Sequence, residues 1–408
     1  MPYSLVDVEV TDALPPISVP AGATGLGLIL RRRRRPVGFV MRALPAGSVI
    51  RPDELAALAS AEAGTILLQE SLREELVTRA AERPAPSLTV AICTRDRTDR
   101  LGRCLQTLLP LRQPAPGGAP RFEILVVDNA PSNDRTATLV GSMSHVRYVL
   151  EPRPGLDFAR NRAVREATRE FLAFVDDDVT VDALWYEGFT DAWTENPDAG
   201  AFTGLVLPFE LATEAQILFE QRGGFRRGFS RLRYSGQTLP GNPAYPTGAG
   251  LFGAGCNMAF RRDLLVRLGG FDEALDTGAP LPGGGDLDIF FRVLRAGAPL
   301  VYEPNLLVYH QHRREMAKLR RQYWTWGLAF TAFVAKSWGS DPSQRRKFVA
   351  LMRWWLADQL RQIGRSVRGR QSFPASLLVV ELAGGVVGFL GTYDRSLRRS
   401  ERIRKQFA

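Results

Sequence analysis

Between residues 88 and 175, four largely apolar runs of strand length alternate with helical segments. The runs are LTVAIC (88–93), FEILVV (122–127), VRYVLE (146–151) and FLAFV (171–175). Strands that alternate with helices in this way predict a parallel, Rossmann-like sheet covered by helices on both faces, which is an α/β fold. Such a sheet binds its ligands at the carboxyl ends of its strands.

Polar residues follow three of these runs directly. They are Thr94, Arg95 and Asp96 after the first run, Asp128 and Asn129 after the second, and Asp176, Asp177 and Asp178 after the fourth. Because the carboxyl ends of parallel strands meet at one edge of a sheet, we expect these polar and acidic groups to converge there.

The triplet Asp176, Asp177 and Asp178 places three like charges at the end of a buried strand. Because like charges repel, we expect a cation to neutralise them. Mg²⁺ and Mn²⁺ take oxygen ligands, and Mg²⁺ is typically held by one or two carboxylates and substrate phosphates. Side chains at i and i+2 of a strand point the same way, so Asp176 and Asp178 are expected to face the metal and Asp177 to point elsewhere. A solvated acidic loop is the alternative interpretation.

Residues 1–86 predict a small α+β accessory domain with its linker. Three strand-like runs precede a helix that begins near Pro52 and continues as an amphipathic stretch to Glu82. The segment RPAPS (83–87) is typical of a linker. The arginine run 31–35 is either an anion-binding patch or, as we favour, a solvated hairpin, because charge runs usually lie on exposed faces.

Residues 87–312 form the predicted catalytic domain, and residues 313–408 a basic, helical C-terminal region. Residues 220–255 are rich in glycine and aromatic side chains with little periodicity, which predicts loops over the ligand site. The segment GGGDLDIFFRVLRAG (283–297) predicts a helix ended by Gly297. Its inward-facing residues are expected to be Leu287, Phe290, Phe291 and Leu294.

The apolar segment 373–393 approaches the length of a membrane span. Glu381 lies in its middle and four glycines weaken it as a helix, so we expect a buried or interfacial helix. Arginines follow it closely, and a peripheral contact with anionic lipid headgroups stays open.

The composition narrows the classes of protein to which this sequence can belong. The 408 residues are 45% hydrophobic and 24% charged, which suits a folded chain with at least one sizeable core. Three cysteines without a CxxC pair favour a reducing compartment and argue against a disulfide scaffold or structural zinc. No signal-peptide pattern is visible at the start, so the expected location is cytoplasmic, with membrane association on the cytoplasmic face left open.

Several motifs together resemble one known family, the inverting family 2 glycosyltransferases of the GT-A fold, over about residues 88–313. The motifs are VAICTRDR (90–97), ILVVDNAPSND (124–134), EPRPGLDFARNRAV (151–164), FLAFVDDDV (171–179), GAGCNMAFRR (253–262) and GGGDLDIFFRVLRAG (283–297). The resemblance implies a metal-dependent hexosyltransferase that moves a sugar from a nucleoside-diphosphate sugar, with a UDP-sugar favoured, to an acceptor hydroxyl. The acceptor is left open between a glycan, a lipid-linked carrier, a peptide and a small molecule.

The resemblance assigns donor-binding and metal-binding roles to particular residues. The predicted nucleotide-sugar ligands are Thr94, Arg95, Asp128, Arg160, Asp176 and Asp177. The carboxylate of Asp128 could accept a hydrogen bond from the ring N–H of uracil or guanine. Asp176 and Asp178 would hold Mn²⁺ or Mg²⁺ in this DxD motif, and His310, favoured over His312, would be a further ligand. The metal would stabilise the leaving nucleoside diphosphate.

The same resemblance assigns the catalytic and acceptor side. Asp286 would be the general base that deprotonates the acceptor hydroxyl in a single, inverting displacement. An N-cap role on the following helix is the structural alternative for Asp286. Asn257, Gly284 and Gly285 are predicted on the acceptor side. Gly285 departs from the family, which usually has Glu at this position. The alternative role for Asn257 is that of a turn amide, and the alternative role for Arg160 is that of an arginine on a helix surface.

Other classes of function fit the sequence less well. A sugar-phosphate nucleotidyltransferase should have a glycine-rich loop after its first strand, but CTRDRTDRL has no glycine. GATGLG (22–27) lacks the spacing of a dehydrogenase fingerprint. A non-catalytic nucleotide-sugar-binding protein predicts loss of Asp178 or Asp286, and both are present. Only the net charge of +10 favours nucleic acid, so no nucleic-acid partner is expected.

Overall fold

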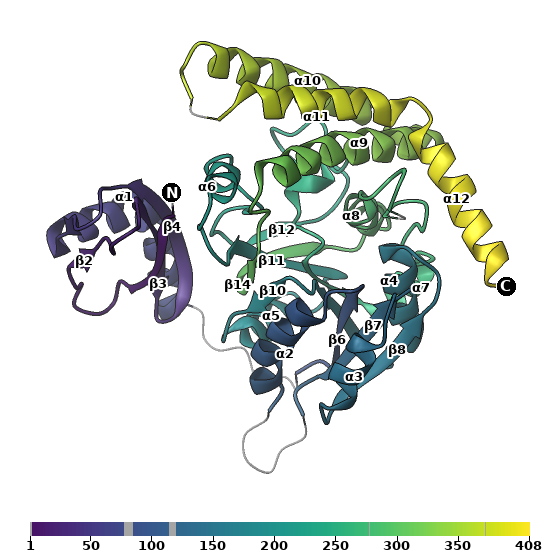
Figure 1. Ribbon diagram of the computed structural model, residues 1–408, viewed down its shortest axis with the longest axis horizontal. Helices are drawn as coiled ribbons and strands as arrows, with labels where there is room; N and C mark the ends of the chain where they lie inside the picture. The colour runs from purple at the N-terminus through teal and green to yellow at the C-terminus, as the bar shows by residue number, and fades with distance from the viewer. Residues whose placement is uncertain (1, 77–84, 114–119, 277, 372) are drawn as a thin grey trace.

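A computed structural model describes residues 2–76, 85–113, 120–276, 278–371 and 373–408 (Figure 1). Its centre is a nine-stranded sheet with strand order β10-β14-β11-β13-β9-β6-β7-β8, in which β12 pairs with β14. The strands are β6 (Leu88–Thr94), β7 (Glu123–Asn129), β8 (Val146–Glu151), β9 (Phe171–Val175), β10 (Val179–Val181), β11 (Ala201–Pro208), β12 (Leu232–Tyr234), β13 (Asn257–Arg261) and β14 (Leu300–His310).

The sheet has a parallel half and a mixed half. The four predicted strand runs became β6, β7, β8 and β9, which are mutually parallel. β13 then runs antiparallel between β9 and β11, β14 is parallel to β11, and β10 and β12 are antiparallel to β14. The predicted α/β class is confirmed, and the antiparallel strands are an addition that the sequence pattern did not indicate.

Helices cover both faces of this sheet. One face packs against α2 (Thr98–Arg112), α3 (Arg135–Gly141) and α5 (Trp185–Glu195). The other packs against α4 (Leu156–Glu166), α7 (Arg262–Arg267) and α8 (Gly285–Arg295). α8 ends at Arg295, its C-cap is Ala296, and the next residue, Gly297, has φ 81°. The predicted end of this helix at Gly297 is therefore confirmed.

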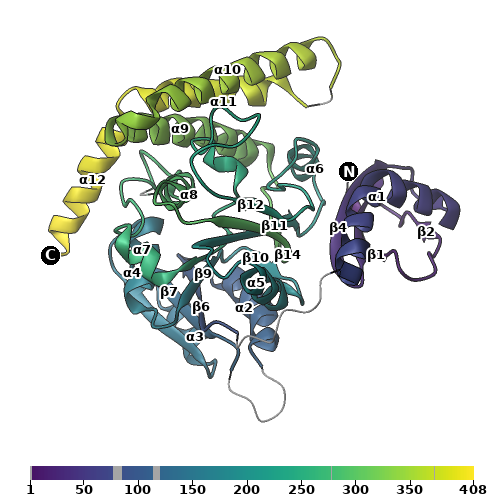
Figure 2. The same cartoon turned by 180° about the vertical axis from the view of Figure 1, so that it is seen from behind.

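The N-terminal residues form a second, smaller sheet beside the large one (Figures 1 and 2). It contains β1 (Ser4–Glu9), β3 (Gly25–Arg32) and β4 (Arg35–Ala43), with the short pair β2 (Ile17–Ser18) and β5 (Val49–Ile50) and the helix α1 (Pro52–Leu76). Ile29 and Phe39 pack in one hydrophobic cluster with residues of β11 and β14. The rest of the predicted helix, residues 77–82, and the first linker residues, 83 and 84, lie outside the described residues.

The arginine run 31–35 lies at the β3–β4 hairpin. Arg33 and Arg34 are exposed in its turn. Arg31 and Arg35 instead form ion pairs with Asp182 at 2.7 Å and Asp191 at 2.8 Å. The expected solvated hairpin therefore applies to the turn alone, because the two ends of the run attach the N-terminal sheet to the catalytic domain.

Four C-terminal helices complete the fold, namely α9 (Met316–Ser340), α10 (Arg345–Val367), α11 (Ala375–Phe389) and α12 (Thr392–Gln406). α11 packs closely against α9 through glycines. A Cβ added at Gly384 would collide with the carbonyl oxygen of Trp324, and one at Gly388 with the hydroxyl of Thr331. The glycines that weaken this segment as an isolated helix thus permit close backbone approach. Within the described ranges no single helix is long and apolar enough to cross a bilayer, although α11 and α12 meet that test as a pair bent by 65°.

Residues 220–255 are largely irregular, as predicted. Their regular parts are the end of α6 (Glu214–Gln221), the strand β12 and the short 3-10 helix η1 (Ala249–Leu251), while a second short 3-10 helix, η2 (Pro342–Gln344), lies between α9 and α10. The ring of Phe225 contacts that of His310, and Arg227 interacts electrostatically with Asp286. The irregular segment therefore borders the predicted site residues.

Candidate active site

The loops that follow β6, β7 and β9 meet at one edge of the sheet. Thr94 Oγ1 donates a hydrogen bond to Asp177 Oδ2 at 2.7 Å, and Arg97 Nη1 donates to Asp177 Oδ1 at 3.0 Å. The backbone N–H and the hydroxyl of Ser132 donate to Asp96 Oδ1 at 2.8 and 2.9 Å. The structure thus brings together the polar strand ends that the sequence pattern predicted would converge.

Asp178 is buried and surrounded by cationic groups. Its carboxylate lies 3.3 Å from Arg100 Nη1, 3.7 Å from Arg97 Nη1 and 3.8 Å from Arg313 Nη1. His310 Nε2 lies 3.3 Å from Asp178 Oδ1. Although burial opposes ionisation, His310 and the arginines hold the pKa of Asp178 well below its ordinary value. We call Arg97, Arg100, Arg313 and His310, the four residues around Asp178, the cationic cluster.

Asp176 differs from its two neighbours. It is half-buried, and among the described residues no hydrogen bond or ion pair reaches its carboxylate. Burial, with the charges of Asp178 and Asp177, raises the pKa of Asp176 to about 6. Asp177 lies in the turn after β9 and points toward Thr94 and Arg97, and burial raises its pKa too. Asp176 is therefore the carboxylate of the triplet that is left for a ligand. Because the triplet follows the strand rather than continuing it, strand alternation does not determine where the three side chains point.

The predicted metal site is not formed by the protein alone. No three His, Cys, Asp or Glu side chains of the described residues lie close enough to hold a metal ion together. The prediction that Asp176, Asp178 and His310 hold one cation therefore stays a prediction, and arginines surround Asp178 in this structure. Two carboxylates and an imidazole still fit a hard cation whose other ligands are substrate phosphates.

His310 and His312 belong to one buried chain of polar contacts. His310 Nδ1 lies 3.0 Å from His312 Nδ1, and His312 Nε2 lies 2.7 Å from Glu220 Oε1. Glu220 forms an ion pair with Arg226 at 3.1 Å, and the Arg226 guanidinium lies over the ring of Phe39 in the N-terminal sheet. His310 is the imidazole that touches Asp178, and His312 and Glu220 fix its orientation from behind.

Asp286 lies in the first turn of α8 and is half-buried. Its Oδ2 accepts a hydrogen bond from the Gly255 N–H at 3.1 Å, and its Oδ1 accepts one from the Leu287 N–H at 2.9 Å. Within the described part of the chain its carboxylate makes no ion pair. Gly284 is the N-cap residue of α8, so the alternative N-cap role for Asp286 is wrong.

Arg160 is a buried cation among carboxylates. Its Nη1 lies 2.9 Å from Asp157 Oδ1 and 3.4 Å from Asp276 Oδ2. Although burial opposes its charge, Asp157, Asp276, Asp176 and Asp286 together raise the pKa of Arg160 above its ordinary value. The alternative that Arg160 is a surface arginine is wrong, since Arg160 is 4% exposed and pairs with Asp157 and Asp276.

Gly284 and Gly285 contribute backbone rather than side chains. Gly284 has φ 104°, a left-handed conformation that favours glycine. The Gly285 N–H donates to Asp276 Oδ2 at 3.0 Å, and a Cβ at Gly285 would collide with the carboxylates of Asp157 and Asp276. The space that a side chain at position 285 would need is thus filled by two other acidic residues.

Three predicted site residues have other roles. The buried side-chain amide of Asn257 bonds to Trp185 Nε1 at 3.0 Å and to the carbonyl oxygens of Leu205 at 3.2 Å and Leu306 at 2.6 Å. These core hydrogen bonds occupy the side-chain amide, and its predicted acceptor contact stays a prediction. The Thr94 hydroxyl is committed to Asp177. Arg95 is exposed and pairs with Asp96 at 3.8 Å, so Arg97 is the arginine of this loop that reaches the Asp triplet.

Asp128 lies buried at the end of β7. Tyr148 OH donates to its Oδ2 at 3.0 Å, while its Oδ1 has no hydrogen-bond partner among the described residues. Burial raises the pKa of Asp128. A buried acceptor without a partner is costly unless a ligand supplies the donor. A base that reaches this oxygen would have to displace the side chains that cover it.

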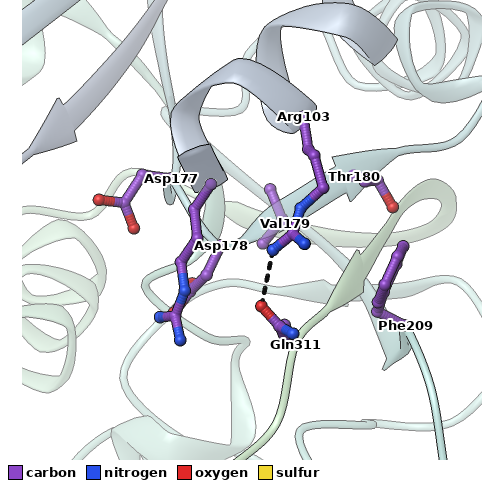
Figure 3. A pocket seen from close by; sticks show the side chains of 8 residues that line it. Arg103, Asp177, Asp178, Val179, Thr180, Phe209 and Gln311 are labelled. Atoms are coloured by element: carbon purple, nitrogen blue, oxygen red, sulfur yellow. Dashed lines mark hydrogen bonds and ion pairs between the residues drawn. The ribbon is translucent and has the colours of Figure 1, made fainter. Parts of the chain in front are cut away.

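A basic cavity of about 500 Å³ adjoins the cationic cluster. Its lining residues are Asp96, Arg97, Thr98, Asp99, Arg100, Arg135, Gln311, His312, Arg313, Arg314, Glu315 and Lys318. A smaller pocket shares Arg100 with this cavity and is also lined by Asp177 and Asp178, and in it Arg103 donates to Gln311 at 2.8 Å (Figure 3). The arginines of both pockets come from the start of α2, the start of α3 and the segment after β14, and sequence reasoning did not identify them.

Comparison with known proteins agrees with this arrangement. Residues 89–269 match the sequence profile described as Glycosyl transferase family 2. This stretch is therefore similar to family 2 glycosyltransferases. The matched stretch begins one residue into β6 and ends after α7, so it includes the Asp triplet and the loop that holds Asp286 through Gly255.

Two curated relatives carry related names. The chain is 25% identical over 193 residues to the glucosyl-dolichyl phosphate glucuronosyltransferase of Haloferax volcanii, an alignment that covers 45% of this chain and 56% of that protein. It is 25% identical over 256 residues to the succinoglycan biosynthesis protein ExoM of Rhizobium meliloti, covering 61% of this chain and 75% of that protein. The chain thus spans little more than half the length of the first of these relatives.

A solved structure supports the fold assignment. The mannosyltransferase PcManGT from Pyrobaculum calidifontis, in complex with GDP-Man and Mn²⁺, superposes with a TM-score of 0.50 at 16% sequence identity. The superposition covers 82% of this chain and 97% of that chain. This similarity confirms the predicted GT-A fold.

Proposed function

We propose that this protein transfers a sugar from a nucleoside-diphosphate sugar to an acceptor hydroxyl, with inversion at the anomeric carbon. One observation carries the proposal: the site has a cationic cluster around Asp178 and a separate carboxylate, Asp286, without an ion-pair partner among the described residues. Cationic groups stabilise the negative charge on a leaving diphosphate, whereas a carboxylate outside any ion pair can accept the proton of an acceptor hydroxyl.

The cationic cluster suits the donor diphosphate. Arg97, Arg100 and Arg313 line the cavity of about 500 Å³ and present guanidinium groups, which bind phosphate oxygens in a bidentate manner. A bound diphosphate would share these guanidiniums with Asp178. Asp176 and Asp178, with His310, would hold Mn²⁺ or Mg²⁺, which supplies positive charge to the departing diphosphate.

Asp286 suits the role of general base. Each of its oxygens accepts one backbone hydrogen bond, which fixes the carboxylate and leaves further lone pairs for the acceptor proton. Deprotonation makes the acceptor oxygen a better nucleophile as it attacks from the side opposite the leaving group. Arg160, which faces both Asp176 and Asp286, would lie beside the reacting sugar and position it.

The nucleotide and acceptor classes follow from less direct observations. The unpaired Asp128 Oδ1 can accept the ring N–H of uracil or guanine, and we favour a UDP-sugar. The relative from Haloferax volcanii carries a lipid-linked sugar in its name, which supports a glycan or lipid-linked acceptor over a free peptide.

Calorimetric titration tests the donor proposal. UDP-glucose, GDP-mannose and dTDP-glucose are titrated into the protein with and without Mn²⁺. We expect one of them to bind at least roughly ten-fold more tightly when Mn²⁺ is present, because the cation shares the diphosphate with Asp178. Binding of none of the three, with or without Mn²⁺, would contradict the proposal.

A further inference from the structure

The net positive charge of the chain comes from its C-terminal residues. Residues 345–408 contain fourteen Lys and Arg against four Asp and Glu, so they carry the whole formal net charge of +10. Residues 1–344 are neutral overall. These last residues include α10, α11 and α12. None of the described residues in the cationic cluster or the cavity lining comes from this segment.

The outward face of α11 is apolar. Val379, Val386 and Leu390 are 50%, 57% and 66% exposed, and Ala383 lies exposed between them. Their spacing of three or four residues places them on one side of the helix. Glu381, the one ionisable residue of α11, bonds instead to Gln359 and Trp355 of α10, and burial raises its pKa. The opposite, glycine-lined side of α11 is held against α9.

The outward face of α10 combines apolar and basic residues. Val349, Leu356, Leu360 and Val367 are exposed at intervals of seven, four and seven residues, which is one face of a helix. Arg346 and Arg353 are exposed at the same spacing within this row. Trp354, exposed beside it, is a residue type that favours membrane–water interfaces. α10 and α11 form the outermost layer of the molecule beyond α9, on the side away from the large sheet (Figures 1 and 2).

We propose that the outward faces of α10 and α11 dock this protein onto the surface of an anionic lipid bilayer. The apolar rows would enter the boundary between headgroups and acyl chains while the arginines contact lipid phosphates, as interfacial amphipathic helices do. A second copy of the chain fits this face poorly, because it would oppose the same excess of positive charge. Nucleic acid leaves the apolar row of α11 without a partner.

Vesicle co-sedimentation of the full chain tests the proposal. The protein is mixed with vesicles of phosphatidylcholine alone and with equimolar phosphatidylcholine and phosphatidylglycerol, without sugar donor or acceptor. We expect it to sediment with the mixed vesicles, and to be released from them as salt screens the charges. Since no transfer reaction is measured, failure here is distinct from failure of the proposed function.

Matched variants separate this surface from net charge. R346Q/R353Q/R368Q removes two exposed arginines of α10 and the exposed arginine at its C-cap. R33Q/R34Q/R42Q removes three exposed arginines of the N-terminal sheet and its hairpin turn. The first variant should bind mixed vesicles about a hundred-fold more weakly, because each arginine near the membrane surface contributes about equally to the free energy of binding. The second should lose less than about three-fold. Equal losses in both variants would overturn the proposal.

A second pair of matched variants tests the exposed apolar row of α11. V379S/V386S/L390S alters exposed side chains of α11, and L68S/L72S/V266S alters exposed side chains elsewhere. Only the first should weaken vesicle binding, by roughly ten-fold or more, with both retaining the wild-type melting temperature. Wild-type protein that stays in the supernatant with both vesicles would overturn the proposal. A concentration-dependent dimer lost in V379S/V386S/L390S would also overturn it, by assigning the face to a second copy.

Discussion

Asp178 and Asp286 are two carboxylates of one site with opposite surroundings. Asp178 is buried among Arg97, Arg100, Arg313 and His310, whereas Asp286 is half-buried and held by two backbone N–H groups. A carboxylate paired with several cations is a poor proton acceptor, but its surroundings suit an anionic ligand. A carboxylate that accepts two backbone hydrogen bonds and forms no ion pair within the described residues retains lone pairs for a proton. The difference predicts that mutations on the two sides will separate binding from chemistry.

The largest effect is expected on the Asp286 side. Asp286→Asn should lower turnover by about a thousand-fold, because the amide cannot accept the acceptor proton, while donor affinity stays within about two-fold. A transfer assay with the donor identified by calorimetry measures turnover. Asp263→Asn, which alters an exposed acidic residue in the first turn of α7, is the control and should be unaffected. Wild-type turnover in Asp286→Asn would remove it as the base.

The next largest effect is expected on the Asp178 side. Asp178→Asn should weaken donor binding in the presence of Mn²⁺ by about a hundred-fold, because the cation loses its most strongly anionic ligand. Titration calorimetry with and without Mn²⁺ measures this change. An Asp178→Asn variant that binds the donor as wild type does, with the same response to Mn²⁺, would refute a metal role for this residue.

A smaller effect is expected from the residues that hold His310. Glu220→Gln removes the carboxylate that bonds to His312 and should weaken Mn²⁺ binding by about ten-fold, because ligands are oriented by the groups behind them. The increase in melting temperature on addition of Mn²⁺ and UDP measures it. Glu214→Gln, an exposed change on the same helix, is the control. If both variants respond to Mn²⁺ alike, the buried chain behind His310 has no part in cation binding.

The smallest effect concerns Gly285, which lies directly before the proposed base. Gly285→Ala should lower the free energy of unfolding by about 1–3 kcal/mol, because its Cβ would collide with the carboxylates of Asp157 and Asp276. Urea denaturation measures the change. Gly102→Ala is the control, since a Cβ there would lie 3.9 Å from Leu139, an ordinary contact. Equal stability of the two variants would show that the space at position 285 is not restricted.

The sequence could predict the parallel half of the sheet, because apolar runs of strand length that alternate with helical segments depend on local periodicity. It could not predict how the Asp triplet divides, because the triplet forms a turn after β9 and strand alternation does not apply there. β10, β13 and β14 were not predicted as antiparallel neighbours, because strand order depends on contacts between distant segments. The pairing of β13 with both β9 and β11 is such a contact.

The cationic cluster shows the same limit at the level of single residues. Arg97, Arg100 and Arg313 come from two distant segments, and nothing in the local pattern distinguished Arg97 from the exposed Arg95. The buried state of Arg160 also depends on tertiary contacts, with Asp276 more than a hundred residues away. Asn257 matched a family motif but is committed to core hydrogen bonds, which a motif alone does not reveal.

The most direct test of the account measures nucleotide binding in Asp178→Asn and Asp286→Asn side by side. The probe is whichever of UDP, GDP and dTDP binds the wild-type protein most tightly with Mn²⁺, titrated by calorimetry. We predict that Asp178→Asn loses the Mn²⁺-dependent part of the affinity and that Asp286→Asn keeps it. Loss of affinity in Asp286→Asn with wild-type binding in Asp178→Asn would contradict the division of the site.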